Sequence, residues 1–523
     1  TLRTQSPIAG NPDGLNFLRI ARTQPFAFHY WEVGNEVYTN NETDEHGQVG
    51  DALPMPAAAT AATHDPTTYI SFAKQFAALA AQIDPTIAIG VDSQTTSSQF
   101  NNWIRNMLAQ CVAQGFAPNY ISDHLYPQQP GLENDAALLS DPSRQVSPTP
   151  ANPFDLVQRA QVYRGIINSA GFSPAQANGI QLLITELNSV SSLPGKQSTS
   201  IVNGLYIADV LGQMMQTEYN GAWIWDLHNG PPSTAGNAAS SLYGWRSVGD
   251  YGIIANGNGA GAANNVQYPD YFAEQLVSKM IQPGGSVVQV SSDDPNLDSF
   301  AVRGANGHLS LLVINKSAAG LKLDASGPNN PSSPYPSITA TFQLSGFIPG
   351  DSAQIWQYGS IEDTQQQNSA TQIPLNHFTQ ALSLSASSFS LSFPNYSMTV
   401  VDLTPAPPQI VSGNYPWNVA GNRIQFTFNQ DMNPASFLTG NLSLTNQDGG
   451  PVPTVSSVSY DAPSKTVTFF LSGTPHDDNY SATLLSGSGS ALVGGAATAS
   501  PFSFNFFALA GDTDHDRDVD NAD

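Results

Sequence analysis

The chain has 523 residues, a formal net charge of −24 and only 11% charged residues. Its length exceeds what a single hydrophobic core supports, so about three or four domains are expected. The acidic balance argues against nucleic acid and anionic membranes as partners, because both select basic patches. No run of about 18 apolar residues is present, so no membrane span is expected.

From about residue 28 to 285, predicted strands alternate with predicted helices. The strands are expected at 29–38, 86–93, 119–127, 179–189 and 221–230, and the helices at 65–85, 100–115, 152–171, 198–220 and 270–281. This alternation predicts parallel βαβ units. Five such units form either an open doubly wound sheet or the last five units of an eight-unit barrel. No Gly-rich phosphate motif follows a strand, which weakens a nucleotide-binding interpretation.

The helical periodicity stops near residue 286. Short alternating runs with turn residues between them predict an antiparallel β-sandwich over 286–405. A Pro-rich linker, TPAPPQ, follows at 404–409, and a second all-β segment over 406–510 has the strand rhythm of an immunoglobulin-like sandwich. We therefore expect four parts: 1–285, 286–405, 406–510 and a short tail at 511–523.

Two glutamates lie at the C-terminal ends of predicted strands. Glu36 lies near the end of the stretch YWEVGNEVY, in which Glu32 is expected on the same face of the strand, and the stretch GIQLLITELNS is apolar until Glu186. Barrels of parallel strands place their active sites at this end. Two carboxyl groups are what glycoside hydrolysis requires, one to protonate the leaving oxygen and one to attack the anomeric carbon. Glu32 is interpreted as a structural carboxylate within the strand layer.

The remaining strand ends suit a sugar pocket. His124 and Tyr126 share one side of their strand, and the Tyr126 hydroxyl could hydrogen-bond a nucleophilic carboxylate. Trp223 and Trp225 share a face that could stack on a sugar ring. Core packing stays open as the alternative for His124 and for both tryptophans. The last predicted strand also contributes His228 as a polar contact.

The stretch YWEVGNE at 30–36, followed about 150 residues later by ITELNS at 184–189, resembles the clan of retaining glycoside hydrolases on (β/α)8 barrels. Its closest form is that of α-L-arabinofuranosidases, with β-xylosidases and heparanase-like β-glucuronidases also similar. The resemblance implies that Glu36 is the acid/base, Glu186 the nucleophile and Asn35 the ligand of the sugar 2-hydroxyl. It also implies a (β/α)8 TIM barrel, of which this chain would hold about the fourth strand to the eighth helix. No catalytic cofactor is implied.

The acidic tail has a calcium-loop spacing. Aspartates occupy loop positions 1, 3, 5, 7, 9 and 12, and these are Asp512, Asp514, Asp516, Asp518, Asp520 and Asp523. Arg517 stands where EF-hand loops carry glycine. An aspartate at position 12 resembles dockerin repeats, which implies a cohesin-like partner. A solvated acidic tail without bound ion stays the alternative.

The sequence leads to one main hypothesis. We expect a secreted or cell-surface bacterial glycoside hydrolase that retains anomeric configuration and acts on plant or microbial polysaccharide. Arabinofuranosidase activity comes first, with β-xylosidase, xylanase, endoglucanase and β-glucuronidase activities as alternatives. A non-catalytic carbohydrate-binding or adhesion protein is the alternative from another class. The retaining hypothesis requires the two carboxyl groups to approach to roughly 5 Å. The chain begins without an initiator Met or signal peptide, so we also expect it to be a piece of a longer precursor.

Overall fold

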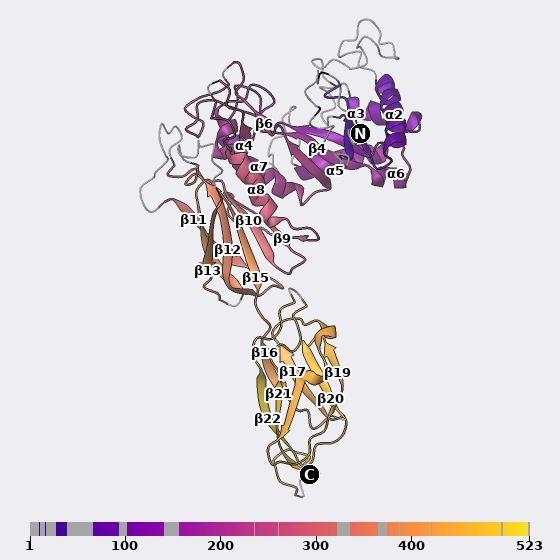
Figure 1. The fold of residues 1–523 in the computed structure, drawn as a ribbon, viewed down its shortest axis with the longest axis vertical. Coiled ribbons are helices and arrows are strands. Elements are labelled where there is room, and N and C mark those ends of the chain that lie inside the picture. The colour runs from indigo at the N-terminus through magenta and orange to yellow at the C-terminus, as the bar shows by residue number, and fades with distance from the viewer. Residues whose placement is uncertain are drawn as a thin grey trace. The chain divides into compact units, whose positions relative to one another are not determined.

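The computed structural model describes residues 10, 16, 28–38, 66–93, 102–140, 156–234, 236–259, 261–321, 335–363, 374–385, 387–419, 421–492 and 495–520. The chain divides into two units, Thr1–Tyr268 with Asn368–Thr371, and Pro269–Gln367 with Gln372–Asp523. Figure 1 labels their helices and strands. None of the helices in these ranges combines the length and the apolar character that crossing a membrane requires.

The first unit contains a five-stranded parallel sheet in sequential order. Its strands are β1 (Tyr30–Val33), β2 (Ala88–Val91), β3 (Tyr120–Leu125), β4 (Gln181–Leu187) and β5 (Tyr219–Ile224). The main connecting helices are α2 (Pro66–Ile83), α3 (Trp103–Ala113), α5 (Leu156–Ser169) and α7 (Ile201–Met214), and each contacts the next. Right-handed crossovers between strands in sequential order put these helices on one face. A doubly wound sheet reverses its strand order, so the open doubly wound alternative is wrong.

The sheet is strongly curved. The rings of Tyr30 on β1 and Trp223 on β5 have centroids 6.4 Å apart, although three strands lie between them. In a flat sheet, strands four places apart are separated by about 19 Å, and their side chains stand perpendicular to the sheet. The two rings can therefore meet only across a concave face, which is the face away from the helices. Curvature of this kind is compatible with successive strands of a barrel.

The core of this unit lies between the convex face of the sheet and the helices. Helix α7 is buried along almost its whole length, which fits its mostly apolar sequence. On the concave face, the Tyr120 ring covers Gly90, and a Cβ atom at position 90 would lie 2.0 Å from it. Shorter elements complete this unit: α4 (Asp135–Leu139), α6 (Pro174–Gly179), the 3-10 helix η3 (Lys196–Thr199), and the paired strands β6 (His228–Asn229) and β7 (Ile254–Ala255).

The second unit begins with α8 (Pro269–Met280), which packs on a six-stranded antiparallel sheet of order β13-β12-β15-β10-β9-β8. Phe272 of α8 stacks on Tyr358 with a centroid distance of 4.0 Å. The strands are β8 (Ser286–Val288), β9 (Leu297–Arg303), β10 (Leu309–Asn315), β12 (Pro349–Gly359), β13 (Asn376–Ala381) and β15 (Ser397–Pro405). A two-stranded sheet, β11 (Ser337–Gln343) with β14 (Ser388–Pro394), packs on its other face.

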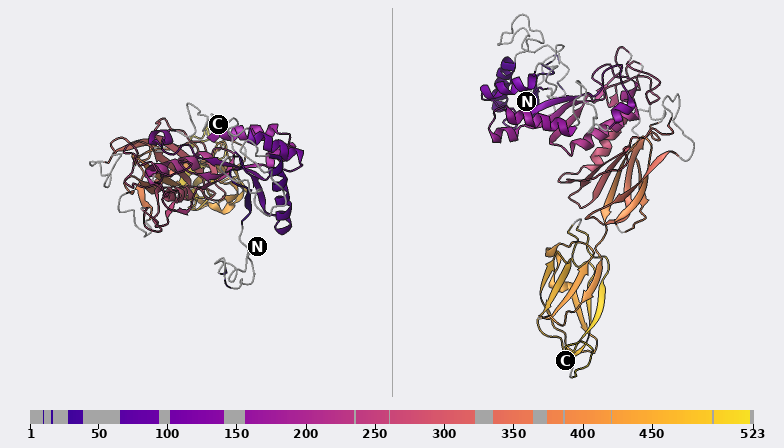
Figure 2. Two further views of the ribbon diagram at one scale, coloured as in Figure 1. Left: turned by 90° about the horizontal axis from the view of Figure 1, so that it is seen from above. Right: turned by 180° about the vertical axis from the view of Figure 1, so that it is seen from behind.

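The last β segment pairs a four-stranded with a three-stranded antiparallel sheet, which is the arrangement of immunoglobulin constant-type domains. The four-stranded sheet has the order β16 (Ile410–Asn414), β17 (Arg423–Phe428), β20 (Thr466–Leu471) and β19 (Val455–Asp461). The three-stranded sheet has the order β18 (Leu442–Asn446), β21 (Asp478–Leu484) and β22 (Phe502–Ala508). Two 3-10 helices, η5 (Pro434–Ser436) and η6 (Thr439–Asn441), lie between them in sequence. The right view in Figure 2 shows this last β segment as strands and loops, with no α-helix among its strands. The antiparallel β character predicted for this half of the chain is confirmed.

Candidate active site

Glu36 lies in a turn and not on the strand. β1 ends at Val33, and Gly34 (φ +89°) and Glu36 (φ +46°) have positive φ, so the chain leaves the extended conformation. The backbone N–H of Val37 donates to Asp92 Oδ2 at 2.7 Å and fastens the turn to the end of β2. The expected continuous strand over 29–38 is wrong, although Glu32 and Glu36 both reach the face that carries His124. The turn, and not strand alternation, brings the Glu36 carboxylate over the concave face.

Glu186 reaches the same face through a β-bulge. On β3 and β4, Asp123 pairs with Ile184 but His124 pairs with Glu186, which leaves Thr185 as an extra residue. Asp123 contacts α5, so regular alternation would turn Glu186 toward the helices together with Ile184. The bulge instead places Glu186 level with His124 on the concave face. Bulges next to active sites commonly redirect a side chain in this way.

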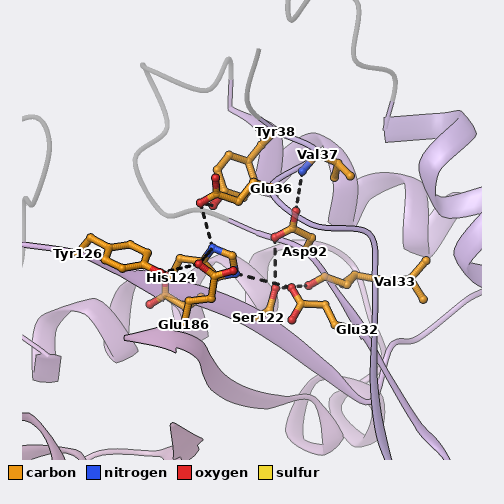
Figure 3. A network of polar contacts seen from close by, with 12 residues as sticks. Glu32, Val33, Glu36, Val37, Tyr38, Asp92, Ser122, His124, Tyr126 and Glu186 are labelled. Carbon is orange, nitrogen blue, oxygen red and sulfur yellow. Dashed lines mark hydrogen bonds and ion pairs between the residues drawn. The ribbon is translucent and has the colours of Figure 1, made fainter. Parts of the chain in front are cut away.

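The two carboxylates meet at one imidazole (Figure 3). His124 Nδ1 lies 3.0 Å from Glu36 Oε1 and 3.4 Å from Glu186 Oε2. One oxygen of each carboxylate lies within 4.8 Å of the other. The Tyr126 hydroxyl donates to Glu186 Oε2 at 2.6 Å, and the Tyr38 hydroxyl donates to Glu36 Oε1 at 3.2 Å. This upper limit on the distance between the nearest oxygens is compatible with the roughly 5 Å that the retaining hypothesis requires between the two carboxyl groups.

Burial and charge shift the pKa values of all three groups. The hydrogen bond from His124 lowers the pKa of Glu36, while burial raises the pKa of Glu186 against the opposing effects of His124 and Tyr126. Burial alone would lower the pKa of His124, but the hydrogen bond to Glu36 and the charges of the surrounding carboxylates raise it to about 9. The imidazole is therefore an imidazolium at neutral pH, and Glu36 is ionised beside it.

A second pair of carboxyl groups lies deeper on the concave face. Glu32 Oε1 is 3.9 Å from His124 Nε2, and Asp92 accepts hydrogen bonds from Val37 N–H and from the Ser122 hydroxyl, the latter at 3.4 Å. Burial raises the pKa of Glu32 and raises that of Asp92 well above its ordinary value. The structural role of Glu32 stays a prediction, because its Oε1 atom is buried without a hydrogen bond among the described residues. Sequence reasoning missed Asp92, although it too follows an apolar strand.

The other residues predicted for the sugar pocket are exposed. Asn35 is exposed in the turn before Glu36, and Trp223 and Trp225 keep 46% and 44% of their surface. Neither tryptophan is a core residue, so the core-packing alternative does not hold for them. The His228 ring lies 3.1 Å from the Ala255 carbonyl and 3.3 Å from Asn264, which ties it to the loop after β7.

Tyr251 is a further residue beside the pair that the sequence did not indicate. Its hydroxyl donates to the Val190 carbonyl at 3.2 Å, and the negative charge of Glu186 contributes to raising its pKa, after burial. It follows no strand and belongs to no motif, so no local pattern marks it.

The tail forms a loop with carboxylates turned toward one another. Asp512, Asp514 and Asp516 bring one oxygen each within 4.8 Å of the others, while Asp518 and Asp520 are exposed further along the loop. Arg517 has φ +78°, the left-handed conformation that glycine usually provides at position 6. An all-oxygen set of this kind suits a hard cation such as Ca²⁺. Asp523 lies outside the described residues.

Comparisons with known proteins give structural likeness only. No protein-family model matches the chain, and no curated protein matches it. Solved structures similar to it include the α-L-arabinofuranosidase of Thermotoga maritima in complex with arabinose, with 15% identity and a TM-score of 0.46 over 74% of this chain and 68% of that one. CelM2, a bifunctional glucanase-xylanase from a metagenome library, has 18% identity and a TM-score of 0.41 over 66% and 62%. A Paenibacillus polymyxa xyloglucanase of glycoside hydrolase family 44 has 14% identity and a TM-score of 0.43 over 65% and 62%. Similarity of this degree does not assign a function to the chain. An assignment must rest on the geometry of the site.

Proposed function

We propose that the chain is a retaining glycoside hydrolase with Glu36 and Glu186 as its two catalytic carboxyl groups. The observation that carries the proposal is their approach, with one oxygen of each within 4.8 Å, on the concave face of a curved parallel sheet. Retaining enzymes hold their carboxyl groups about 5–5.5 Å apart, whereas inverting enzymes leave about 6.5–9.5 Å for a water molecule.

In the proposed reaction, Glu186 attacks the anomeric carbon and forms a glycosyl-enzyme while Glu36 protonates the leaving oxygen. Glu36 then deprotonates the water that releases the sugar. The hydroxyl of Tyr126 holds the Glu186 carboxylate in place at 2.6 Å. Neither step requires a cofactor, so chelation with EDTA should leave hydrolysis unchanged.

The pKa directions bear on how Glu36 obtains its proton. An acid/base must carry a proton before the first step, yet the hydrogen bond from His124 favours the ionised Glu36. We propose that the imidazole of His124 holds this proton until Glu36 needs it. Transfer along the 3.0 Å contact between His124 Nδ1 and Glu36 Oε1 gives a neutral imidazole and a protonated Glu36. The alternative is that the two glutamates exchange roles.

A mechanism-based label tests both the reaction and the roles. A 2-deoxy-2-fluoro glycoside with a good leaving group should trap the glycosyl-enzyme, and mass spectrometry of peptides should find the label on Glu186. Glu36→Gln and Glu186→Gln should each lower kcat by at least ~10³-fold. Glu218→Gln is the control and should leave kcat unchanged, because Glu218 pairs with Arg164 and not with a residue of the site. A label on Glu36 would establish exchanged roles. Unchanged hydrolysis in both Gln variants would refute the proposal.

We propose an α-L-arabinofuranoside as the first substrate to test, with xylosides, glucans and glucuronides as alternatives. Asn35, Trp223, Trp225 and His228 are proposed sugar contacts. The exposed tryptophan rings suit stacking on a sugar. A panel of aryl glycosides and plant polysaccharides identifies the substrate. Binding to polysaccharide without turnover on the whole panel would favour the non-catalytic, carbohydrate-binding alternative.

For the tail, we propose Ca²⁺ binding by Asp512, Asp514, Asp516 and their successors in the loop. The alternating carboxylates and the left-handed turn at Arg517 support this proposal. Secretion and a cohesin-like partner are proposals that follow from the dockerin-like spacing alone.

A further inference from the structure

The convex side of β3, directly behind the carboxyl pair, holds a buried ion pair. Asp123 is 1% exposed and faces α5, where Arg159 is 3% exposed. Arg159 donates from Nε to Asp123 Oδ2 at 2.6 Å and from Nη2 to Asp123 Oδ1. The hydroxyls of Tyr163, one turn further along α5, and of Tyr219, at the start of β5, each donate to Asp123 at 2.8 Å. Both oxygens of the carboxylate are therefore fully hydrogen-bonded.

Such a pair adds little net stability, because the cost of removing two charges from water offsets their attraction. Its main effect is geometric. The planar guanidinium grips the carboxylate at two points, which a flexible ammonium group cannot do. Asp123 is thus held at one position relative to both α5 and β5.

The position of the pair along β3 gives it a role in the site. Asp123 is the last residue before the register shift between β3 and β4, and His124 is the first residue after it. Arg159 Nη2 also donates to the His124 carbonyl oxygen at 3.2 Å. The Arg159 side chain therefore binds both residues that flank the register shift. It binds Asp123 through the side-chain carboxylate and His124 through the backbone carbonyl.

We infer that Arg159 and Asp123 are positioning residues, which fix the bulge between β3 and β4 and so aim His124 and Glu186 at the concave face. Neither of them reaches the concave face itself. The catalytic meaning of this inference rests on the proposed function. A displacement of about 1 Å in such a site lowers turnover by up to ~100-fold.

The kinetic test uses two conservative changes on one helix. Arg159→Lys keeps the charge and loses the two-point grip, so kcat should fall about 10- to 100-fold while KM changes less than about 2-fold. Arg164→Lys is the matched control, because Arg164 lies on α5 but pairs with Glu218 and with carbonyl groups near α6. Wild-type kcat in Arg159→Lys, or an equal loss in Arg164→Lys, would overturn the inference.

A second readout does not depend on turnover. The ¹⁵N and ¹H chemical shifts of the His124 imidazole should change in Arg159→Lys and stay at wild-type values in Arg164→Lys. If the wild-type protein hydrolyses no glycoside, the proposed function fails, but this spectrum still decides the positioning role. Unchanged His124 shifts would refute it. If Arg159→Lys does not fold, Tyr219→Phe replaces it, because this change removes one hydrogen bond to Asp123. The His124 shifts should then change in Tyr219→Phe.

Discussion

At the scale of single residues, His124 determines the charge state of the site. Four carboxyl groups face its ring: Glu36 from the turn after β1, Glu32 from β1, Asp92 from the end of β2 and Glu186 from β4. A buried imidazole without such partners would lose its proton more easily than in water. Here the carboxylates outweigh the burial, so the cation is kept where the proposed reaction needs a proton.

The first prediction concerns this titration. In ¹⁵N-histidine-labelled protein, the His124 ring should titrate with a pKa of about 9. In Glu36→Gln, the pKa should move down toward the ordinary value of 6.5, because the hydrogen bond that contributes most to raising it loses its charge. Glu218→Gln serves as the control and should leave the value at about 9. NMR measures both, and an unshifted pKa in Glu36→Gln would contradict the contact.

The same shift has a consequence for stability. A histidine whose pKa is raised on folding stabilises the folded state fully below pH 6.5, its unfolded value, and this contribution is lost as the pH rises through about 9. The free energy of unfolding of the first unit should therefore fall between these two pH values. Hydrogen exchange in β3 measures it, and the slope should flatten in His124→Gln.

At the scale of elements, the sequence predicts the type and order of the strands but not their irregularities. The five parallel strands follow from alternating apolar runs and amphipathic helices. The bulge at Thr185 does not, because the run LLITEL has no glycine or proline to indicate an extra residue. The end of β1 is marked by Gly34, but a positive φ at Glu36 is unusual for a charged residue and no pattern predicts it. The sequence indicates both carboxylates because each follows an apolar run, yet each reaches the site by a local departure from regular geometry.

The second prediction compares two glycines of the first unit. Gly90→Ala should lower the free energy of unfolding by about 1–3 kcal/mol, because the Cβ atom of the new alanine would lie 2.0 Å from the Tyr120 ring. Gly165→Ala should stabilise it by about 0.5–1 kcal/mol, since Gly165 lies within α5 and no atom would contact its new Cβ within 4 Å. Thermal unfolding followed at 222 nm reports the helices of this unit. Shifts of the same sign in both variants would contradict the packing described.

The third prediction concerns the acidic loop. Trp417 stacks on His515 with a centroid distance of 4.7 Å, so its ring lies against the loop that contains the aspartates. Tb³⁺, which substitutes for Ca²⁺, should therefore emit when tryptophan is excited, and Ca²⁺ should displace it. Asp512→Asn should weaken binding at least ~10-fold, because it removes the charge at position 1. Asp448→Asn, outside the loop, is the control, and equal emission from both variants would refute the site.

At the scale of the whole molecule, the charge of −24 limits the substrates that can approach easily. An anionic polymer is repelled over about a Debye length, which is ~10 Å at 0.1 M salt, whereas a neutral polysaccharide is not. Under the proposed function, we therefore expect neutral polysaccharides such as arabinoxylans, xylans and glucans without uronic acid to be better substrates than polyuronides.

The fourth prediction follows from this charge. On a neutral substrate, KM should change less than about 2-fold between ~20 and ~500 mM NaCl, because no net charge on the polymer is screened. On a substrate rich in uronic acids, KM should fall as salt rises. Initial rates at several salt concentrations measure both. A strong salt effect on the neutral substrate would contradict this prediction.

The contact between Tyr30 and Trp223 across the concave face gives the protein an internal optical reporter. An indole ring that is 46% exposed and 6.4 Å from a tyrosine emits differently when water is displaced from around it. A sugar or a polypeptide segment that covers this face should shift the contribution of Trp223 to the emission to shorter wavelength without any added dye. Because the chain has seven tryptophans, a Trp223→Phe variant, which should lose this shift, identifies the contribution and lets occupancy of the concave face be followed before its ligand has been identified.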